Sequence, residues 1–61
     1  MAKVLIFDEY PSIRNLLAEE LAGEGNVVLT IGRVGLIWNG IAAFNPDLAI
    51  LDLFLRGDFR W

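Results

Sequence analysis

The hydrophobic positions fall first into a continuous run and then into a helical stripe. The run Val4–Phe7 contains β-branched and aromatic residues, which predicts a strand buried on both faces. Pro11 suits the first turn of a helix, because its fixed φ and missing N–H cost little there. Isoleucine or leucine follows at positions 13, 16, 17 and 21, which predicts an amphipathic helix whose remaining arc holds Arg14, Asn15, Glu19 and Glu20.

The middle of the chain predicts a second strand and a second helix. Glycines at positions 23 and 25 end the first helix, since glycine tolerates the left-handed backbone that follows many helices. Residues 27–31 predict the second strand. Residues 36–44 predict a helix that is apolar almost all round, which is typical of a buried helix. Asn45-Pro46-Asp47 ends that helix, because the residue before a proline avoids the α region.

Residues 48–53 predict a third strand, which completes a βαβαβ pattern with short connections. Because such crossovers are right-handed, the pattern predicts a single α/β domain over residues 1–61 with a three-stranded parallel sheet. A chain of this size buries only about 60% of the surface that its unfolded form exposes. Yet 56% of its residues are hydrophobic, and it has no cysteine or histidine for disulfides or a zinc site. We therefore expect self-association, association with a missing segment, or association with a partner.

Charge and hydropathy exclude several classes of function. Five Lys and Arg against eight Asp and Glu give a net charge of −3, which argues against a nucleic-acid partner. The longest nearly apolar run, Val34–Phe44, is far shorter than the roughly 20 residues of a membrane span. The N-terminus lacks the features of a signal peptide, so we expect a cytoplasmic protein without membrane association.

Three carboxylates follow the predicted strands. Asp8 and Glu9 come directly after the first strand, and Asp52 lies at the end of the third. The C-terminal ends of parallel strands are where such sheets place their sites. Neighbouring carboxylates repel one another unless a cation lies between them, and an all-oxygen donor set favours Mg²⁺. An aspartate beside Mg²⁺ can act as a nucleophile toward a phosphoryl group. Ordinary solvated loop residues are the alternative interpretation of the same pattern.

Two motifs carry a family resemblance. The stretch Lys3–Glu9 followed by Pro11–Arg14 resembles the start of a response-regulator receiver domain, a CheY-like domain with a flavodoxin-like fold. The stretch Asn45–Leu53, with Gly57 shortly after, resembles the third strand and phosphorylation loop of that family. The resemblance implies the strand order 2-1-3 and a place in a two-component phosphorelay, with a histidine kinase as partner.

The resemblance also assigns roles to individual residues. It implies that Asp52 is the phosphoacceptor. It implies that Mg²⁺ is held by Glu9, by Asp8 through water, by Asp52 and by the backbone carbonyl of Phe54. Receiver domains have five strands, so the chain matches only their N-terminal half, without the Ser/Thr of strand four and the Lys of strand five. The apolar second-helix region, where such domains are often polar, favours an engineered or selected half-receiver.

These considerations lead to one expected function and two alternatives. We expect a truncated receiver fragment that self-associates, most simply as a homodimer joined at the third strand, with a residual Mg²⁺ site. No independent enzymatic activity is expected, since no complete set of groups that would activate a nucleophile can be named. The first alternative is a signalling module phosphorylated on Asp52. The second is an interaction module that adds its third strand to another protein's sheet.

Overall fold

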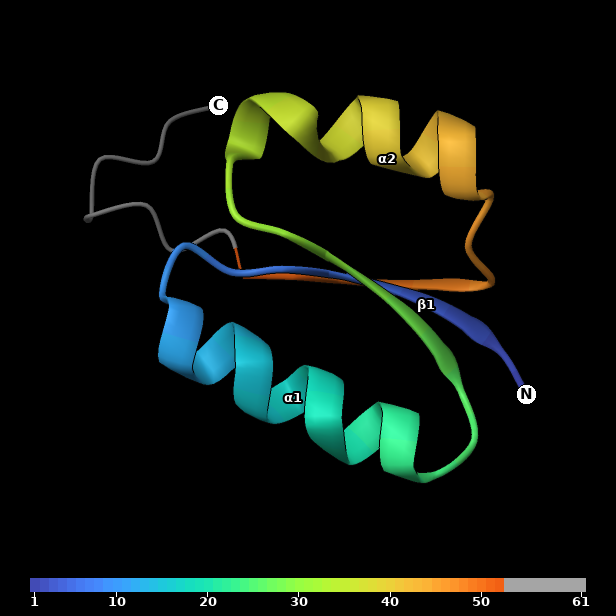
Figure 1. Ribbon diagram of the computed structural model, residues 1–61. Helices are drawn as coiled ribbons and strands as arrows, with labels where there is room; N and C mark the ends of the chain where they lie inside the picture. Colours follow the sequence, from blue (N-terminus) through green and yellow to red (C-terminus); the bar gives the residue numbers. More distant parts are fainter. Residues whose placement is uncertain (53–61) are drawn as a thin grey trace.

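The computed structural model of the protein describes residues 1–52. Its elements are β1 (Lys3–Phe7), α1 (Pro11–Gly23), β2 (Val27–Ile31), a single 3-10 turn (Val34–Leu36), α2 (Ile37–Phe44) and β3 (Leu48–Leu51). Figure 1 shows three layers, with α1 and α2 on opposite faces of the sheet. The sheet has the order β2-β1-β3, and both pairings are parallel. The structure is thus the α/β half of a flavodoxin-like fold, as the sequence predicted.

The central position of β1 explains its continuous apolar sequence. β1 pairs with β2 from Lys3 opposite Val27 to Phe7 opposite Ile31, and with β3 up to Phe7 opposite Leu51. Strands lie on both sides and helices on both faces, so residues 4–7 are at most 3% exposed. Leu5 and Phe7 form the core with residues of β2 and α2.

Helix α2 approaches the sheet closely at a glycine. A Cβ on Gly40 would lie 3.1 Å from the Cδ1 atoms of both Ile31 and Leu5, so the missing side chain lets the helix backbone approach the core. Ile37 is buried on the same side of the helix. The expectation of a helix buried all round was wrong, however, because Trp38 is 77% exposed. An eight-residue helix that covers a sheet with one side leaves its other side in water, whatever its composition.

Helix α1 also differs from the predicted stripe. Its half-buried side chains are those at positions 14, 17, 18 and 21, while Ile13 and Leu16 are exposed. The spacing of 3, 1 and 3 is that of one helix face, so the sheet-facing line is rotated from the predicted one and includes Arg14. The predicted polar arc was therefore wrong for Arg14, and correct for Glu19 and Glu20, which are exposed.

Two residues in left-handed backbone end the helices. Gly25, with φ of 93°, follows α1, and its N–H donates to the carbonyl of Ala22 at 3.0 Å. Asn45, with φ of 51°, caps α2 through a bond from its N–H to the Ile41 carbonyl. The predicted helix break at residues 45–47 is therefore confirmed. The third strand ends at Leu51 rather than at the predicted residue 53, which lies outside the described residues.

Neither α1 nor α2 is long and apolar enough to cross a membrane, and residues 1–52 contain no other α-helix.

Candidate functional site at the acidic end of the sheet

The sheet brings Asp8 and Asp52 to the same end. Phe7 is level with Leu51 in the register of β1 and β3, so the next residue of each strand is an aspartate. The Asp52 N–H donates to the Phe7 carbonyl at 3.0 Å, and the Asp8 N–H donates to the Ile31 carbonyl at 3.2 Å. Both aspartates are therefore fixed at the backbone to strand β1, one by sequence and one by a hydrogen bond.

The Asp8 carboxylate is buried and organises the turn into α1. Its side chain is 3% exposed, and its Oδ1 accepts the Tyr10 N–H at 2.9 Å. This bond closes a local turn through Glu9, after which Pro11 begins α1. Burying a carboxylate costs free energy unless hydrogen bonds or a cation offset it. A cation beside Asp8 would therefore be stabilised there.

Arg14 reaches the same turn from α1. Its Nη1 donates to the backbone carbonyl of Asp8 at 2.9 Å, and the Asp8 carboxylate bonds to the Tyr10 N–H. The guanidinium also lies against Gly32, at the end of β2, where a Cβ would be 2.6 Å from Nη1. Sequence reasoning missed both residues, although the line of positions 14, 17, 18 and 21 would have placed Arg14 toward the sheet.

For the other predicted site residues, Glu9, Asp52 and Phe54, the structure gives less detail. Glu9 and Asp52 are both half-buried. Phe54, whose carbonyl is the fourth predicted ligand, lies outside the described residues. Within residues 1–52 no group of three or more Asp, Glu, His or Cys side chains is arranged to hold a metal. The carboxylates would have to draw together for a cation to bind, and the magnesium site stays a prediction.

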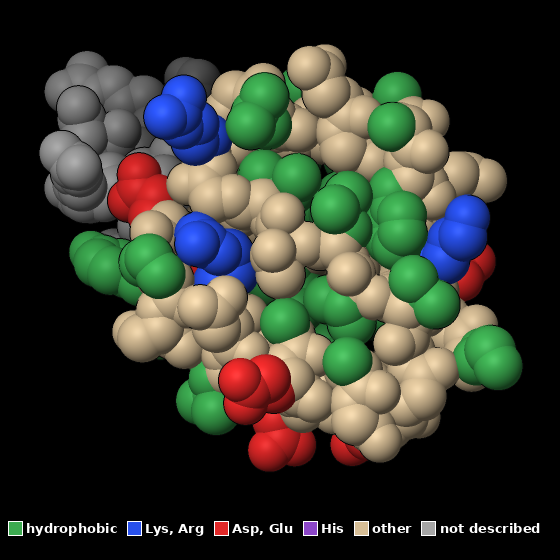
Figure 2. All heavy atoms as spheres, viewed as in Figure 1, with side chains coloured by type: hydrophobic (Ala, Val, Ile, Leu, Met, Phe, Trp, Pro, Cys, Tyr) green, Lys and Arg blue, Asp and Glu red, His purple; other side chains and the backbone are tan. Residues whose placement is uncertain are grey.

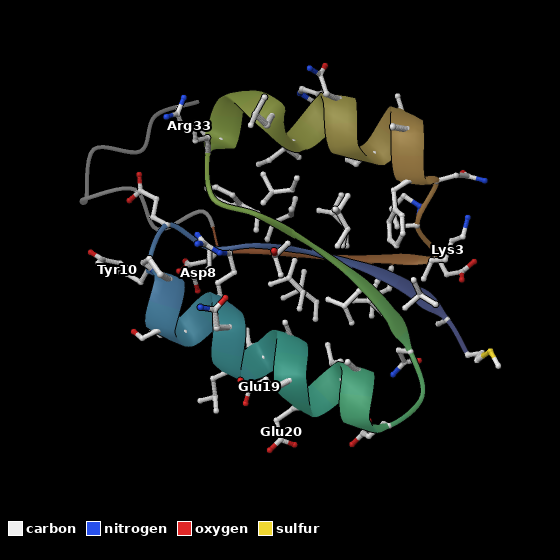
Figure 3. The ribbon with its side chains drawn as sticks, in the orientation of Figure 1. Lys3, Asp8, Tyr10, Glu19, Glu20 and Arg33 are labelled. Carbon is white, nitrogen blue, oxygen red and sulfur yellow. The ribbon has the colours of Figure 1, made fainter. Side chains whose placement is uncertain are left out.

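Lys3, Glu19 and Glu20 lie apart from this turn. Figure 3 shows Asp8 and Tyr10 at one end of the sheet, with Arg33 at the same end of the molecule and Lys3 at the opposite end. Glu19 and Glu20 point away from the sheet on α1. With Leu16, Gly23 and Glu24 they line a shallow hollow on the outer side of that helix. Figure 2 shows acidic side chains gathered over α1, so this hollow is separate from the acidic end of the sheet.

Comparison with known proteins shows what this arrangement resembles. The topology and the two motifs are consistent with a partial receiver domain of the response-regulator type. Over 55 residues, 90% of its length, the chain is 34% identical to the DNA-binding response regulator MtrA of Mycolicibacterium smegmatis. The chain spans about a quarter, 24%, of that protein. No protein-family profile matches the chain, and no solved structure matches it. The predicted resemblance to a receiver domain is confirmed by the similarity to MtrA and by the strand order.

Proposed function

We propose that the chain is a receiver-type signalling module in which Asp52 accepts a phosphoryl group. The observation that carries this proposal is the hydrogen bond from the Asp52 N–H to the Phe7 carbonyl, which fixes Asp52 beside the strand that ends in Asp8. The similarity to a response regulator over 90% of the chain supports the same conclusion. The proposed phosphodonor is a histidine kinase or a small acyl phosphate.

The chemistry is a single transfer. A carboxylate oxygen of Asp52 attacks the phosphorus of the donor, and a new P–O bond forms. The bond from phosphorus to the leaving group breaks, and the leaving group keeps the electron pair. The product is an acyl phosphate on Asp52, so the chain is a phosphoacceptor and no further turnover is proposed. Asp8 and Glu9 add negative charge beside an anionic donor, which disfavours the transfer unless a cation offsets it.

Oxygen donors of this kind fit Mg²⁺. Asp8, Glu9 and Asp52 supply only carboxylate oxygens, which are hard ligands, and the buried Asp8 carboxylate gains most from a cation. We propose that these three residues hold the ion, with the Phe54 carbonyl as the fourth ligand. When bound, Mg²⁺ would neutralise charge on the carboxylates and on the transferring phosphoryl group.

The proposal is tested by intact-mass spectrometry. The protein is incubated with acetyl phosphate and Mg²⁺, and its mass should rise by one phosphate. Asp52→Asn should abolish the gain, whereas Glu19→Gln, an exposed site on α1, should keep it. An unchanged wild-type mass, under conditions that label a complete receiver, would defeat the proposal, as would equal labelling of Asp52→Asn.

A second candidate function, self-association at β3, has its own observation. Within residues 1–52, β3 pairs with β1 alone, and three of its four apolar residues are exposed. Leu48 is 55% exposed and Leu51 39%. A flat apolar edge strand is a template for pairing with another strand. We propose that two copies join at β3 in an antiparallel pair, as two-fold symmetry requires.

The two edges of the sheet offer matched variants for this second candidate. Val27 begins β2 at the opposite edge and is 51% exposed, close to the value for Leu48. Figure 2 shows hydrophobic side chains on the viewed face between the two helices, where β2 runs. Light scattering coupled to size exclusion should give a dimer for the wild type and for Val27→Lys, and a monomer for Leu48→Lys. A compact wild-type monomer at micromolar concentration would overturn the candidate.

A further inference from the structure

Arg14, on the sheet-facing side of α1, makes a direct hydrogen bond to the acidic turn. Arg14 is half-buried, on the same helix face as Leu17, Ala18 and Leu21. The long apolar stem of an arginine can lie along such a surface while its charged head reaches a polar partner at the edge. Here the partner is the backbone carbonyl of Asp8, 2.9 Å from Nη1. The first turn of α1 is thereby tied to the end of β1.

The position of this hydrogen bond matters for the carboxylates. Asp8 is held twice, through its carbonyl by Arg14 and through its Oδ1 by the Tyr10 N–H. Because the Arg14 guanidinium donates to the Asp8 carbonyl, it fixes the turn and leaves the Asp8 carboxylate available to a cation. A side chain that paired with the carboxylate itself would compete with a bound cation instead.

Gly32 determines where the guanidinium can lie. A Cβ on Gly32 would meet Nη1 at 2.6 Å, Cζ at 3.2 Å and Nη2 at 3.6 Å of Arg14. The backbone of Gly32 is not in the left-handed region, so space rather than conformation favours glycine here. Gly35, three residues later, has no atom within 4 Å of the corresponding Cβ position. The two glycines are therefore a matched pair that differs in contact with Arg14.

We infer that Arg14 is a positioning residue for the Asp8–Glu9 pair, and that Gly32 leaves the space that this role needs. The functional consequence of this inference rests on the proposed function, since a displaced turn would misplace Asp8 and Glu9, the two carboxylates proposed to act with Asp52. The first test nevertheless concerns the turn alone. The clashing atoms belong to the far end of a flexible side chain, so Gly32→Ala should move the guanidinium rather than disrupt the fold.

The first experiment reads the Tyr10 amide by NMR without divalent cations. In Gly32→Ala and Arg14→Ala its chemical shift should move and its hydrogen exchange should become roughly tenfold faster, as expected when a local hydrogen bond is weakened. Gly35→Ala should leave both unchanged. The Asp47 amide, bonded to the Lys3 carbonyl at the other end of the sheet, should be unchanged in every variant and so reports an intact fold.

Double substitution separates positioning from general destabilisation. Gly32→Ala acts through the guanidinium, so it should have no further effect on the Tyr10 amide in the Arg14→Ala background. Arg14→Lys, which keeps the charge and one donor, should restore part of the wild-type shift. A Tyr10 amide that is identical in wild type, Gly32→Ala and Arg14→Ala would overturn the inference, as would additive effects in the double variant.

A second experiment distinguishes this inference from the proposed function. Phosphorylation of Asp52 by acetyl phosphate should be at least several-fold slower in Gly32→Ala than in Gly35→Ala. In both variants an unchanged Asp47 amide signal should show that the fold is intact. Equal rates, with a wild type that is labelled normally, would overturn the role of Arg14. A wild type that is never labelled, together with the expected Tyr10 effects, would overturn the proposed function and leave Arg14 as the residue that positions the turn.

Discussion

Lys3 and Asp47 exchange two hydrogen bonds at the end of the sheet opposite the acidic turn. The Asp47 N–H donates to the Lys3 carbonyl at 2.7 Å, and the Lys3 N–H donates to Asp47 Oδ2 at 2.8 Å. The Lys3 ammonium also donates to the Phe44 carbonyl at 3.2 Å and lies 5.5 Å from the centroid of that ring. These contacts set the start of β3 against β1. Since strands have a nearly fixed rise per residue, the contacts at the start of β3 also help to place Asp52 level with Asp8.

Asp47→Ala should lower the free energy of unfolding by about 0.5–1 kcal/mol, because the Lys3 N–H loses its carboxylate acceptor at an exposed site. Urea denaturation measures the difference. Glu20→Ala, on the outer side of α1, is the control and should change stability by less than about 0.5 kcal/mol. Equal effects of the two substitutions would show that the Lys3–Asp47 pair does not hold the strand.

Gly40→Ala and Gly23→Ala should shift stability in opposite directions. Gly40 lies inside α2, where alanine gains about 1 kcal/mol in helix propensity, and Gly23 is the last residue of α1, where the gain is smaller. At Gly40 the new Cβ would meet Ile31 and Leu5 at 3.1 Å, and overpacking of about 1–3 kcal/mol outweighs that gain. At Gly23 nothing lies within 4 Å. Thermal unfolding should give a lower midpoint for Gly40→Ala and a higher one for Gly23→Ala. A stabilised Gly40→Ala variant would contradict the close packing of α2.

Asn45→Ala should destabilise the fold by about 1 kcal/mol, because the left-handed conformation at φ of 51° is costly for a residue with a Cβ and no local polar side chain. Asn45→Gly should be neutral or slightly stabilising, since glycine adopts this conformation without strain. Chemical denaturation of the two variants, compared with wild type, tests the assignment. If alanine and glycine were equivalent, the helix cap would not depend on left-handed backbone.

Asp8→Asn should raise stability in the presence of EDTA by about 1 kcal/mol and remove any stabilisation by Mg²⁺. The substitution removes a buried charge but keeps an oxygen that can accept the Tyr10 N–H. Thermal midpoints with EDTA and with millimolar Mg²⁺ measure both effects, and Glu19→Gln is the control. Under the proposed function, the wild type and the control gain stability from Mg²⁺ and Asp8→Asn does not. An Asp8→Asn protein that responds to Mg²⁺ like wild type would place the ion elsewhere.

The hydrophobic pattern predicted the strands and the acidic end of the sheet, whereas the strand order came from the resemblance to receiver domains and is confirmed by the structure. Continuous apolar runs identify buried strands, and parallel pairing then brings Asp8 and Asp52 to one end. The facing side of α1 was not predicted, since apolar residues at 13, 16, 17 and 21 outweighed Arg14 in the pattern. Which apolar side chains are covered depends on neighbouring elements, so the composition of α2 did not reveal the exposure of Trp38.

The candidate site was predictable in its residues but not in its contacts. Aspartates at strand ends can be recognised in a sequence, whereas the bond from Arg14 to the Asp8 carbonyl depends on a glycine in another connection. The proposed metal coordination would depend further on side-chain rotamers and on Phe54, which lies outside the described residues. Homodimerisation, magnesium binding and a histidine kinase partner therefore stay predictions.

The middle position of β1 has a consequence for how the chain reaches its native state. β1 is synthesised before β2 and β3 and is the most buried of the three strands, and both of its partners lie far along the sequence. Neither partner can be reached by a tight hairpin, because parallel strands need a crossover connection. Long loops must therefore close before the sheet gains its pairing energy, which favours slow folding. On the ribosome, β1 has to wait for residues 48–51 before its second edge is covered, and chaperone contact during that interval would protect it from aggregation.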